Sequence, residues 1–157
     1  MRYLLLLLFV LLCHYAKAQI TNPFATLKYD SVVMYDFIPG GEEGQIVSKG
    51  KLDGKIKKRV VLDKATVNSL NKILGLKSSF NGIIAGCFDP HLGFVYYRSG
   101  KIVGHISVCL ACNQLYSTPD IKRRMPGLSN SLRHYFNQLL IRYKFSYILT
   151  AAQEKKE

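Results

Sequence analysis

A two-residue turn near the middle of the chain is the feature that most constrains its fold. Ser99-Gly100 separates two runs, Leu92–Arg98 and Lys101–Cys109, that are rich in β-branched and aromatic residues. Runs of this composition joined by two residues, one of them glycine, are typical of a β-hairpin. The sequence therefore predicts an antiparallel pair of strands over residues 92–109.

The register of this hairpin brings three cysteines to its open end. If Arg98 pairs with Lys101, the extended ladder places Cys87 opposite Cys112, and Cys109 lies at the end of the second strand. Directly opposed residues have Cα atoms about 4.5–5.5 Å apart, within the range that a disulfide spans. The register predicts a Cys87–Cys112 disulfide with Cys109 as the odd thiol, and a Cys109–Cys112 bond is the competing pairing.

The same cysteines have an alternative interpretation as zinc ligands. Cys87, His91, Cys109 and Cys112 form a Cys₃His set, and the spacing of the last two is typical of structural zinc sites. Alternation along a strand argues against the set, because His91 and Cys109 then point to opposite faces. We therefore expect no cofactor, with zinc as the alternative.

Redox catalysis and other enzymatic activity are less favoured. A thioredoxin-like Cys-x-x-Cys begins a helix whose N-terminus lowers the thiol pKa, but no helical pattern follows Cys112. Cys87 or Cys109 could act as a nucleophile only with His105 within hydrogen-bond reach. The chain has no Gly-x-Ser-x-Gly, phosphate-binding glycine loop or His-Glu-x-x-His motif. We therefore expect a protein that is not an enzyme, with a thiol-redox protein as a second alternative.

The cysteine segment also resembles a known group of sequences. Residues 85–113, which include CFDPHLGFVYYRSGKIVGHISVCLAC, are similar to small, uncharacterised bacterial proteins that carry signal sequences. Members share a Cys-x-x-Pro start, a β-hairpin and a Cys-x-x-Cys end. The resemblance implies no activity, and it implies that five residues form one motif: Cys87, Pro90, His91, Cys109 and Cys112. Many members have Arg-His where this chain has His91-Leu92, which weakens a ligand role for His91.

The N-terminus has the features of a secretory signal. Arg2 precedes an apolar run from Leu4 to Leu12, and Ala16-Lys17-Ala18 is the small-x-small pattern that precedes a signal-peptidase cut. The run is too short for a transmembrane anchor. Cys13 follows the large Leu12, which disfavours lipoprotein processing. We therefore expect cleavage after Ala18 and a secreted or periplasmic protein.

The remaining patterns predict one α+β domain over residues 19–149. Strands are expected at Leu27–Phe37 and in a first hairpin that joins Gln45–Leu52 to Lys55–Leu62 through Asp53-Gly54. Apolar spacing and capping residues predict two amphipathic helices. The first is capped by Asp63 and ends at Gly75, and the second covers about residues 130–144. The predicted fold is an antiparallel sheet of two hairpins plus an N-terminal strand, with the two helices packed on it.

The ends of this domain have weaker patterns. Gln114–Leu128 carries two prolines and is expected to be irregular, and Phe145–Leu149 is expected to add a last short strand. Residues 150–157, a charged tail, are expected to be disordered.

Charge indicates what kind of partner the chain meets. The net charge is +12, and two basic runs contribute, residues 55–59 and 122–124. Nucleic-acid binding would need aromatic side chains among the basic ones, which neither run has, so no nucleic acid is expected. A basic surface favours an anionic envelope component, and abundant tyrosines suit a protein partner. We expect a structural or binding role at the cell envelope, with the oligomeric state open.

Overall fold

A five-stranded antiparallel sheet in the order β4-β1-β5-β6-β7 organises the chain. The structure, a computed structural model, describes residues 22–41, 43–121 and 127–154. The strands are β1 Ser31–Ile38, β2 Val47–Ser48, β3 Lys51–Leu52, β4 Lys55–Val61, β5 Leu92–Arg98, β6 Lys101–Cys109 and β7 Gln114–Thr118. The helical segments are η1 Pro23–Ala25, α2 Lys64–Leu74, η2 Lys77–Ser79, α3 Asn130–Arg142 and α4 Ala151–Glu154. The predicted α+β class is confirmed, and the predicted signal peptide lies outside the described residues.

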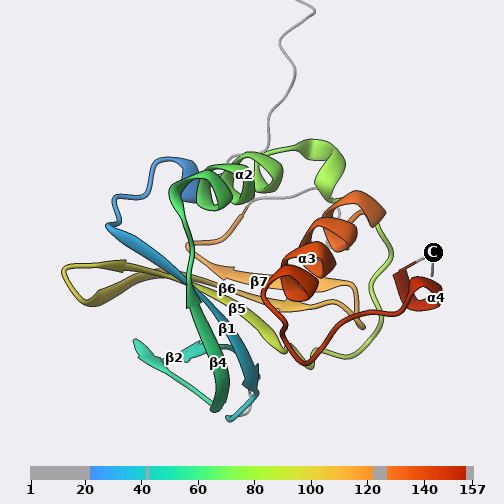
Figure 1. Cartoon of the computed structure of the whole chain (residues 1–157), viewed down its shortest axis with the longest axis horizontal. Helices are drawn as coiled ribbons and strands as arrows, with labels where there is room; N and C mark the ends of the chain where they lie inside the picture. The colour runs from blue at the N-terminus through green and yellow to red at the C-terminus, as the bar shows by residue number, and fades with distance from the viewer. Residues whose placement is uncertain (1–21, 42, 122–126, 155–157) are drawn as a thin grey trace, which may run out of the picture.

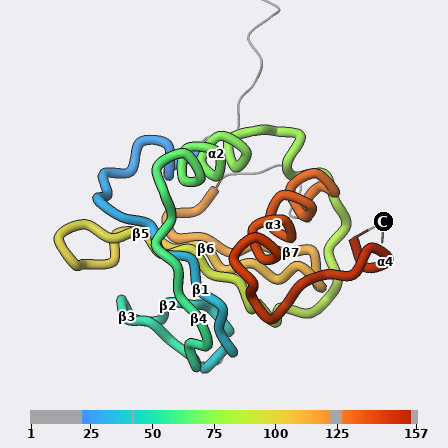
Figure 2. The backbone as a smooth tube through the Cα atoms, in the orientation of Figure 1, coloured from blue at the N-terminus to red at the C-terminus, as the bar shows by residue number. Residues whose placement is uncertain are grey.

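The two faces of the sheet are covered by different elements. Helices α2 and α3 lie on one side, and the small β2–β3 sheet lies on the other (Figures 1 and 2). Both faces of β1 are buried as a result: Val32 and Met34 pack in the helix-side core, and Val33, Tyr35 and Phe37 pack under the β2–β3 sheet. A strand that is buried on both faces has a nearly continuous apolar run, as β1 does, and β1 lies inside the sheet between β4 and β5.

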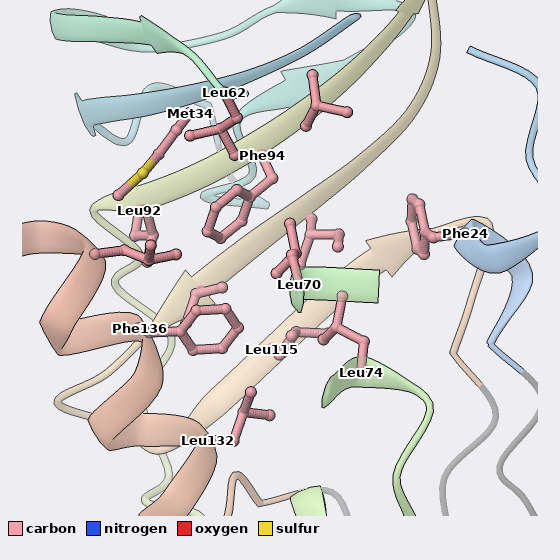
Figure 3. Close-up of a cluster of buried hydrophobic side chains, with 14 of the residues drawn as sticks. Phe24, Met34, Leu62, Leu70, Leu74, Leu92, Phe94, Leu115, Leu132 and Phe136 are labelled. Atoms are coloured by element: carbon pink, nitrogen blue, oxygen red, sulfur yellow. The ribbon is translucent and has the colours of Figure 1, made fainter. Parts of the chain in front are cut away.

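Both long helices begin where the sequence predicts, and α3 ends at Arg142, two residues before the predicted end. Asp63 accepts a hydrogen bond from the Thr66 amide at 2.8 Å and caps α2, which ends at Gly75. Ser129 caps α3 through the Leu132 amide at 3.2 Å. The apolar faces of the two helices meet the sheet in one core, which Figure 3 shows around Leu70, Leu74, Phe94, Leu132 and Phe136.

The first predicted hairpin is wrong. The tight turn falls at Lys49-Gly50, where both residues have positive φ and β2 pairs with β3. Asp53-Gly54 instead redirects the chain from β3 into β4, whose Lys55 pairs with Ile38 of β1. Gly54 has φ 81°, and a Cβ there would lie 2.2 Å from the Ile38 carbonyl oxygen. Glycine is therefore required at this position by a close approach to β1 rather than by a hairpin.

Four other segments differ from the prediction. The first strand begins at Ser31 rather than Leu27, and β7 occupies part of the segment that was expected to be irregular. Residues 145–149 form no strand; this irregular segment runs back along α3, where the Leu149 amide donates to the Asn137 side-chain oxygen at 2.8 Å. Ala151–Glu154 forms a short helix rather than a disordered tail, because the buried Arg133 guanidinium donates to the Gln153 and Glu154 carbonyl oxygens.

Candidate functional site

The three cysteines of the described chain gather where the 81–91 loop meets the turn between β6 and β7. Cys109 is the last residue of β6, Cys112 lies in the turn, and Cys87 lies in the loop that precedes β5. Asn113 closes the turn with φ 58°, a left-handed conformation that asparagine tolerates better than most residues. The turn therefore sets the spacing of Cys109 and Cys112, and the loop brings Cys87 to them.

Cys87 and Cys112 form a disulfide with a Cα–Cα distance of 5.7 Å, the pairing that the sequence analysis favours over Cys109–Cys112. Cys109 is a free, buried thiol. The two disulfide residues differ in accessibility, because Cys87 is exposed and Cys112 is only 2% exposed. One sulfur-bearing residue thus faces solvent while the other belongs to the interior.

The register by which we predicted this pair is wrong in detail. The β5–β6 ladder begins with Arg98 opposite Lys101, as expected, but it shifts by one residue between Tyr96 and Tyr97. Regular pairing then ends at Leu92 opposite Val108, so the cysteines lie beyond the ladder. The disulfide therefore joins a loop to a turn rather than two opposed strand positions.

Hydrogen bonds hold the loop against the turn independently of the disulfide. The Ala85 amide donates to the Cys112 carbonyl oxygen at 3.0 Å, and the Asn113 side-chain amide donates to the Ile83 carbonyl oxygen at 2.7 Å. The Gln114 side-chain amide donates to the carbonyl oxygens of Ala85 and Cys87. The path of the loop is thus defined by backbone contacts on both sides of Cys87.

Cys109 lies in a pocket of backbone amides. Its sulfur accepts a hydrogen bond from the Cys112 amide at 3.2 Å, and the amides of Asp89 and Ala111 also face it. Amide donors favour a thiolate, but the side chain is almost completely buried. Burial is the larger effect and raises the pKa of Cys109, so the protonated thiol predominates at neutral pH.

His91 lies among groups other than the cysteines. Its ring nitrogens are 3.0 Å from the Phe37 carbonyl oxygen and 3.2 Å from an Asp89 carboxylate oxygen, and its ring stacks on Tyr147 with centroids 3.3 Å apart. Within the described ranges, no group of three or more His, Cys, Asp or Glu side chains is arranged to hold a metal ion. The structure thus does not bring the predicted Cys₃His set together around one point.

His105 is buried on the sheet face that the β2–β3 sheet covers. Its Nε2 lies 3.0 Å from the Gln45 side-chain oxygen, and the neighbouring Ser107 hydroxyl accepts from the Ile46 amide at 2.9 Å. Cys109 is four residues further along β6, roughly 13 Å away along an extended strand, and Cys87 is tied in the disulfide. Neither Cys87 nor Cys109 therefore lies within hydrogen-bond reach of His105 as a nucleophile–base pair would require.

Burial of His105 predicts a loss of stability in mild acid. Desolvation lowers its pKa from 6.5 to about 4, so between these values the unfolded chain binds a proton that the folded chain does not. We expect the free energy of unfolding to fall by about 2 kcal/mol as the pH drops through this window. Urea unfolding at several pH values should show that His105→Gln removes this slope. The exposed-histidine variant His134→Gln should keep it, and an unchanged slope in His105→Gln would contradict the assignment.

A shallow groove runs beside the disulfide. It has a volume of about 320 Å³ and passes between the 81–91 loop and the C-terminal segment. Its apolar rim includes Ile83, which is 78% exposed, and Ile84. The residues on its opposite side include Arg133, Leu149 and Gln153. The groove offers space for a small apolar group next to Cys112.

The β4 edge of the sheet carries the basic run 55–59. Lys55, Lys57 and Arg59 are exposed, and none of them forms a salt bridge with a carboxylate of the described chain. The intervening Lys58 is committed to the fold, because its ammonium donates to the Tyr143 and Lys144 carbonyl oxygens at the end of α3. Three of the four cations of this run thus face solvent, and the fourth, Lys58, holds the strand against the end of α3.

Comparisons with known proteins add no family assignment. Searches against protein-family models, curated proteins and solved structures found no match to this chain. Over the residues that the structure describes, none of the helices is both long and apolar enough to cross a membrane.

Proposed function

We propose that this chain is a non-catalytic, exported binding domain of the cell envelope, and that the β4 edge contacts an anionic envelope polymer. The observation that carries the proposal is the set of three exposed cations on β4 with no carboxylate partner within the described ranges. A surface cation without a carboxylate partner has its charge available to an external anion, although Lys57 also lies over the Tyr147 ring, with its ammonium 5.0 Å from the centroid.

The three cations lie close together along β4. Lys55, Lys57 and Arg59 fall within five residues of the strand, roughly 13 Å along its length, and the register shift leaves Lys57 without an opposed residue on β1. The pairing of β4 with β1 is irregular between Asp36 and Phe37, opposite this run, and a bulge of this kind discourages the edge from pairing with another strand. A side-chain contact with a charged chain is therefore a better use of this edge than strand addition.

A stapled scaffold supports a binding role more than a catalytic one. The disulfide fixes the 81–91 loop, and His105, the histidine that could have activated a cysteine, is bonded to Gln45 instead. An oxidising compartment, which the predicted signal peptide implies, is where such a bond persists.

Charge removal on β4 tests the proposal. The triple variant Lys55→Gln, Lys57→Gln, Arg59→Gln should bind dextran sulfate about tenfold more weakly than the parent, because each exposed charge contact contributes roughly 0.5 kcal/mol. Titration calorimetry at 50, 150 and 300 mM NaCl should also give a shallower salt dependence for the variant.

The matched control removes the same number of charges elsewhere. Lys64→Gln, Lys72→Gln and Lys77→Gln change exposed lysines on or next to α2 and should weaken binding by less than threefold. Equal losses in the two triple variants would mean that net charge alone drives association, and binding that ignores salt or extends to uncharged dextran would reject the electrostatic contact.

A further inference from the structure

The three cysteines share one turn and loop but differ in the two properties that govern thiol exchange, access and bonding. Cys109 is 1% exposed and reduced, Cys112 is 2% exposed and bonded, and Cys87 is exposed and bonded. A disulfide that only stabilises the fold needs neither an exposed cysteine nor a free thiol beside it, and this one has both. Either Cys109 or Cys87 can in principle be the partner of Cys112.

The turn places Cys109 within reach of Cys112. The turn spans Leu110 to Asn113, whose amide donates to the Leu110 carbonyl oxygen, and Cys109 directly precedes it. The Cys112 amide contacts the Cys109 sulfur at 3.2 Å, and this contact is what places the thiol beside Cys112. The thiol therefore lies beside the residue that carries the buried half of the existing bond.

We infer that Cys109 exchanges with Cys87 for the sulfur of Cys112, so that the protein has a second disulfide state, Cys109–Cys112, in which Cys87 is a free and exposed thiol. The inference goes beyond the proposed binding role, because it assigns a covalent modification site at Cys87 and does not involve β4.

The exchange is balanced within the chain. Cys109 loses its proton, its thiolate attacks the Cys112 sulfur, the Cys87–Cys112 bond breaks, and Cys87 leaves as a thiolate that takes up a proton from solvent. Cys87, Cys109 and Cys112 hold one disulfide and one thiol both before and after the exchange, so no oxidant or reductant is consumed. The freed Cys87 thiolate can then attack a disulfide-bearing partner, bonding to one partner sulfur while the other leaves as a thiolate.

Backbone contacts allow the exchange without loss of the local fold. The hydrogen bonds from Ala85 to Cys112 and from Gln114 to the Cys87 carbonyl oxygen do not depend on the S–S bond. Cys87 thus stays at the loop surface after release, a few residues from the exposed Ile83 and Ile84. The amides around Cys109 are already placed to stabilise its thiolate once it ionises.

Trapping the exchanged state at Cys87 tests the inference. The native, fully oxidised protein is incubated with N-ethylmaleimide at pH 7, 8 and 9 without reductant, quenched, unfolded and mapped by mass spectrometry. We expect the label on Cys87, together with a Cys109–Cys112 disulfide. The rate should rise about tenfold between pH 7 and 8, because burial keeps the Cys109 pKa above this range.

Two variants control the measurement. Cys109→Ser keeps a small acceptor for the three amides and should abolish labelling of Cys87, which excludes incompletely oxidised protein as the source of the label. Cys87→Ser should form a Cys109–Cys112 disulfide on incubation with oxidised glutathione, leaving no thiol among the cysteines of the described residues. Label found only on Cys109, or undiminished Cys87 label in Cys109→Ser, or two persistent thiols in Cys87→Ser, would each overturn the inference.

Discussion

Truncating Phe136 to alanine is expected to lower the free energy of unfolding by about 4 kcal/mol. The ring is completely buried in the helix-side core, where its centroid lies 5.6 Å from that of Phe94 on β5 (Figure 3). Removing it deletes contacts between α3 and the sheet and leaves a cavity in a close-packed core. Urea unfolding of the oxidised protein, followed by circular dichroism, measures the loss.

A residue on the opposite side of the same helix is the control. Ile141 is 46% exposed, so Ile141→Ala removes an aliphatic side chain from α3 without opening a core cavity. We expect it to cost less than about 1 kcal/mol. A similarly small cost for both substitutions would show that packing of Phe136 on the sheet contributes little to stability, because alanine favours the helix at both positions.

Elements that depend on local residues could be predicted from the sequence. The α2 helix follows from Asp63, an apolar stripe and Gly75, and the β5–β6 hairpin follows from Ser99-Gly100, whose positive φ values suit a tight hairpin turn. In each case the residues that decide the structure lie within one turn of it. The α+β class followed from the same local signals.

Register and strand order depended on distant contacts and were not predictable in the same way. The β5–β6 shift leaves Val103 without an opposed residue, and the adjacent Gly104 packs against Leu27 and Phe24, where a Cβ would lie 2.9 Å from a Leu27 methyl. An isolated glycine within a strand pattern was the available signal for a bulge. No local pattern shows that β4 pairs with β1, because this pairing depends on the backbone hydrogen-bonding groups along the second edge of β1, which is distant in sequence.

The sequence identified the cysteines of the candidate site but not the contacts that bring them together. Cysteine spacing identified Cys87, Cys109 and Cys112, but the loop reaches the turn through Asn113 and Gln114, whose side-chain contacts carry no periodic signal. The stacking of Tyr147 on His91, which withdraws that histidine from the cysteines, joins residues far apart in the chain. β7 was missed although Leu115 and Ser117 alternate with exposed Tyr116 and Thr118, because the prolines that follow suggested an irregular segment.

Removing the disulfide is expected to lower the free energy of unfolding by about 3 kcal/mol and the melting temperature by on the order of 10 °C. The bond joins residues that are 25 apart in sequence, and the loop that it closes contains all of β5 and β6. Closing this loop restricts the conformations of the unfolded chain. The double variant Cys87→Ala, Cys112→Ala should show this loss in urea unfolding, and wild-type protein in dithiothreitol should match it.

Treatment with reductant distinguishes the effect of breaking the disulfide from the effect of replacing its two side chains. The double variant should be insensitive to dithiothreitol, because its one remaining cysteine in the described chain, Cys109, has no partner sulfur there. The hydrogen bonds from Ala85 and Gln114 should keep the native circular dichroism spectrum of the reduced protein below its transition, since they hold the loop without the bond. A loss below about 1 kcal/mol would mean that these contacts already confine the loop in the unfolded ensemble. The bond would then matter less for stability than for determining which cysteine is exposed.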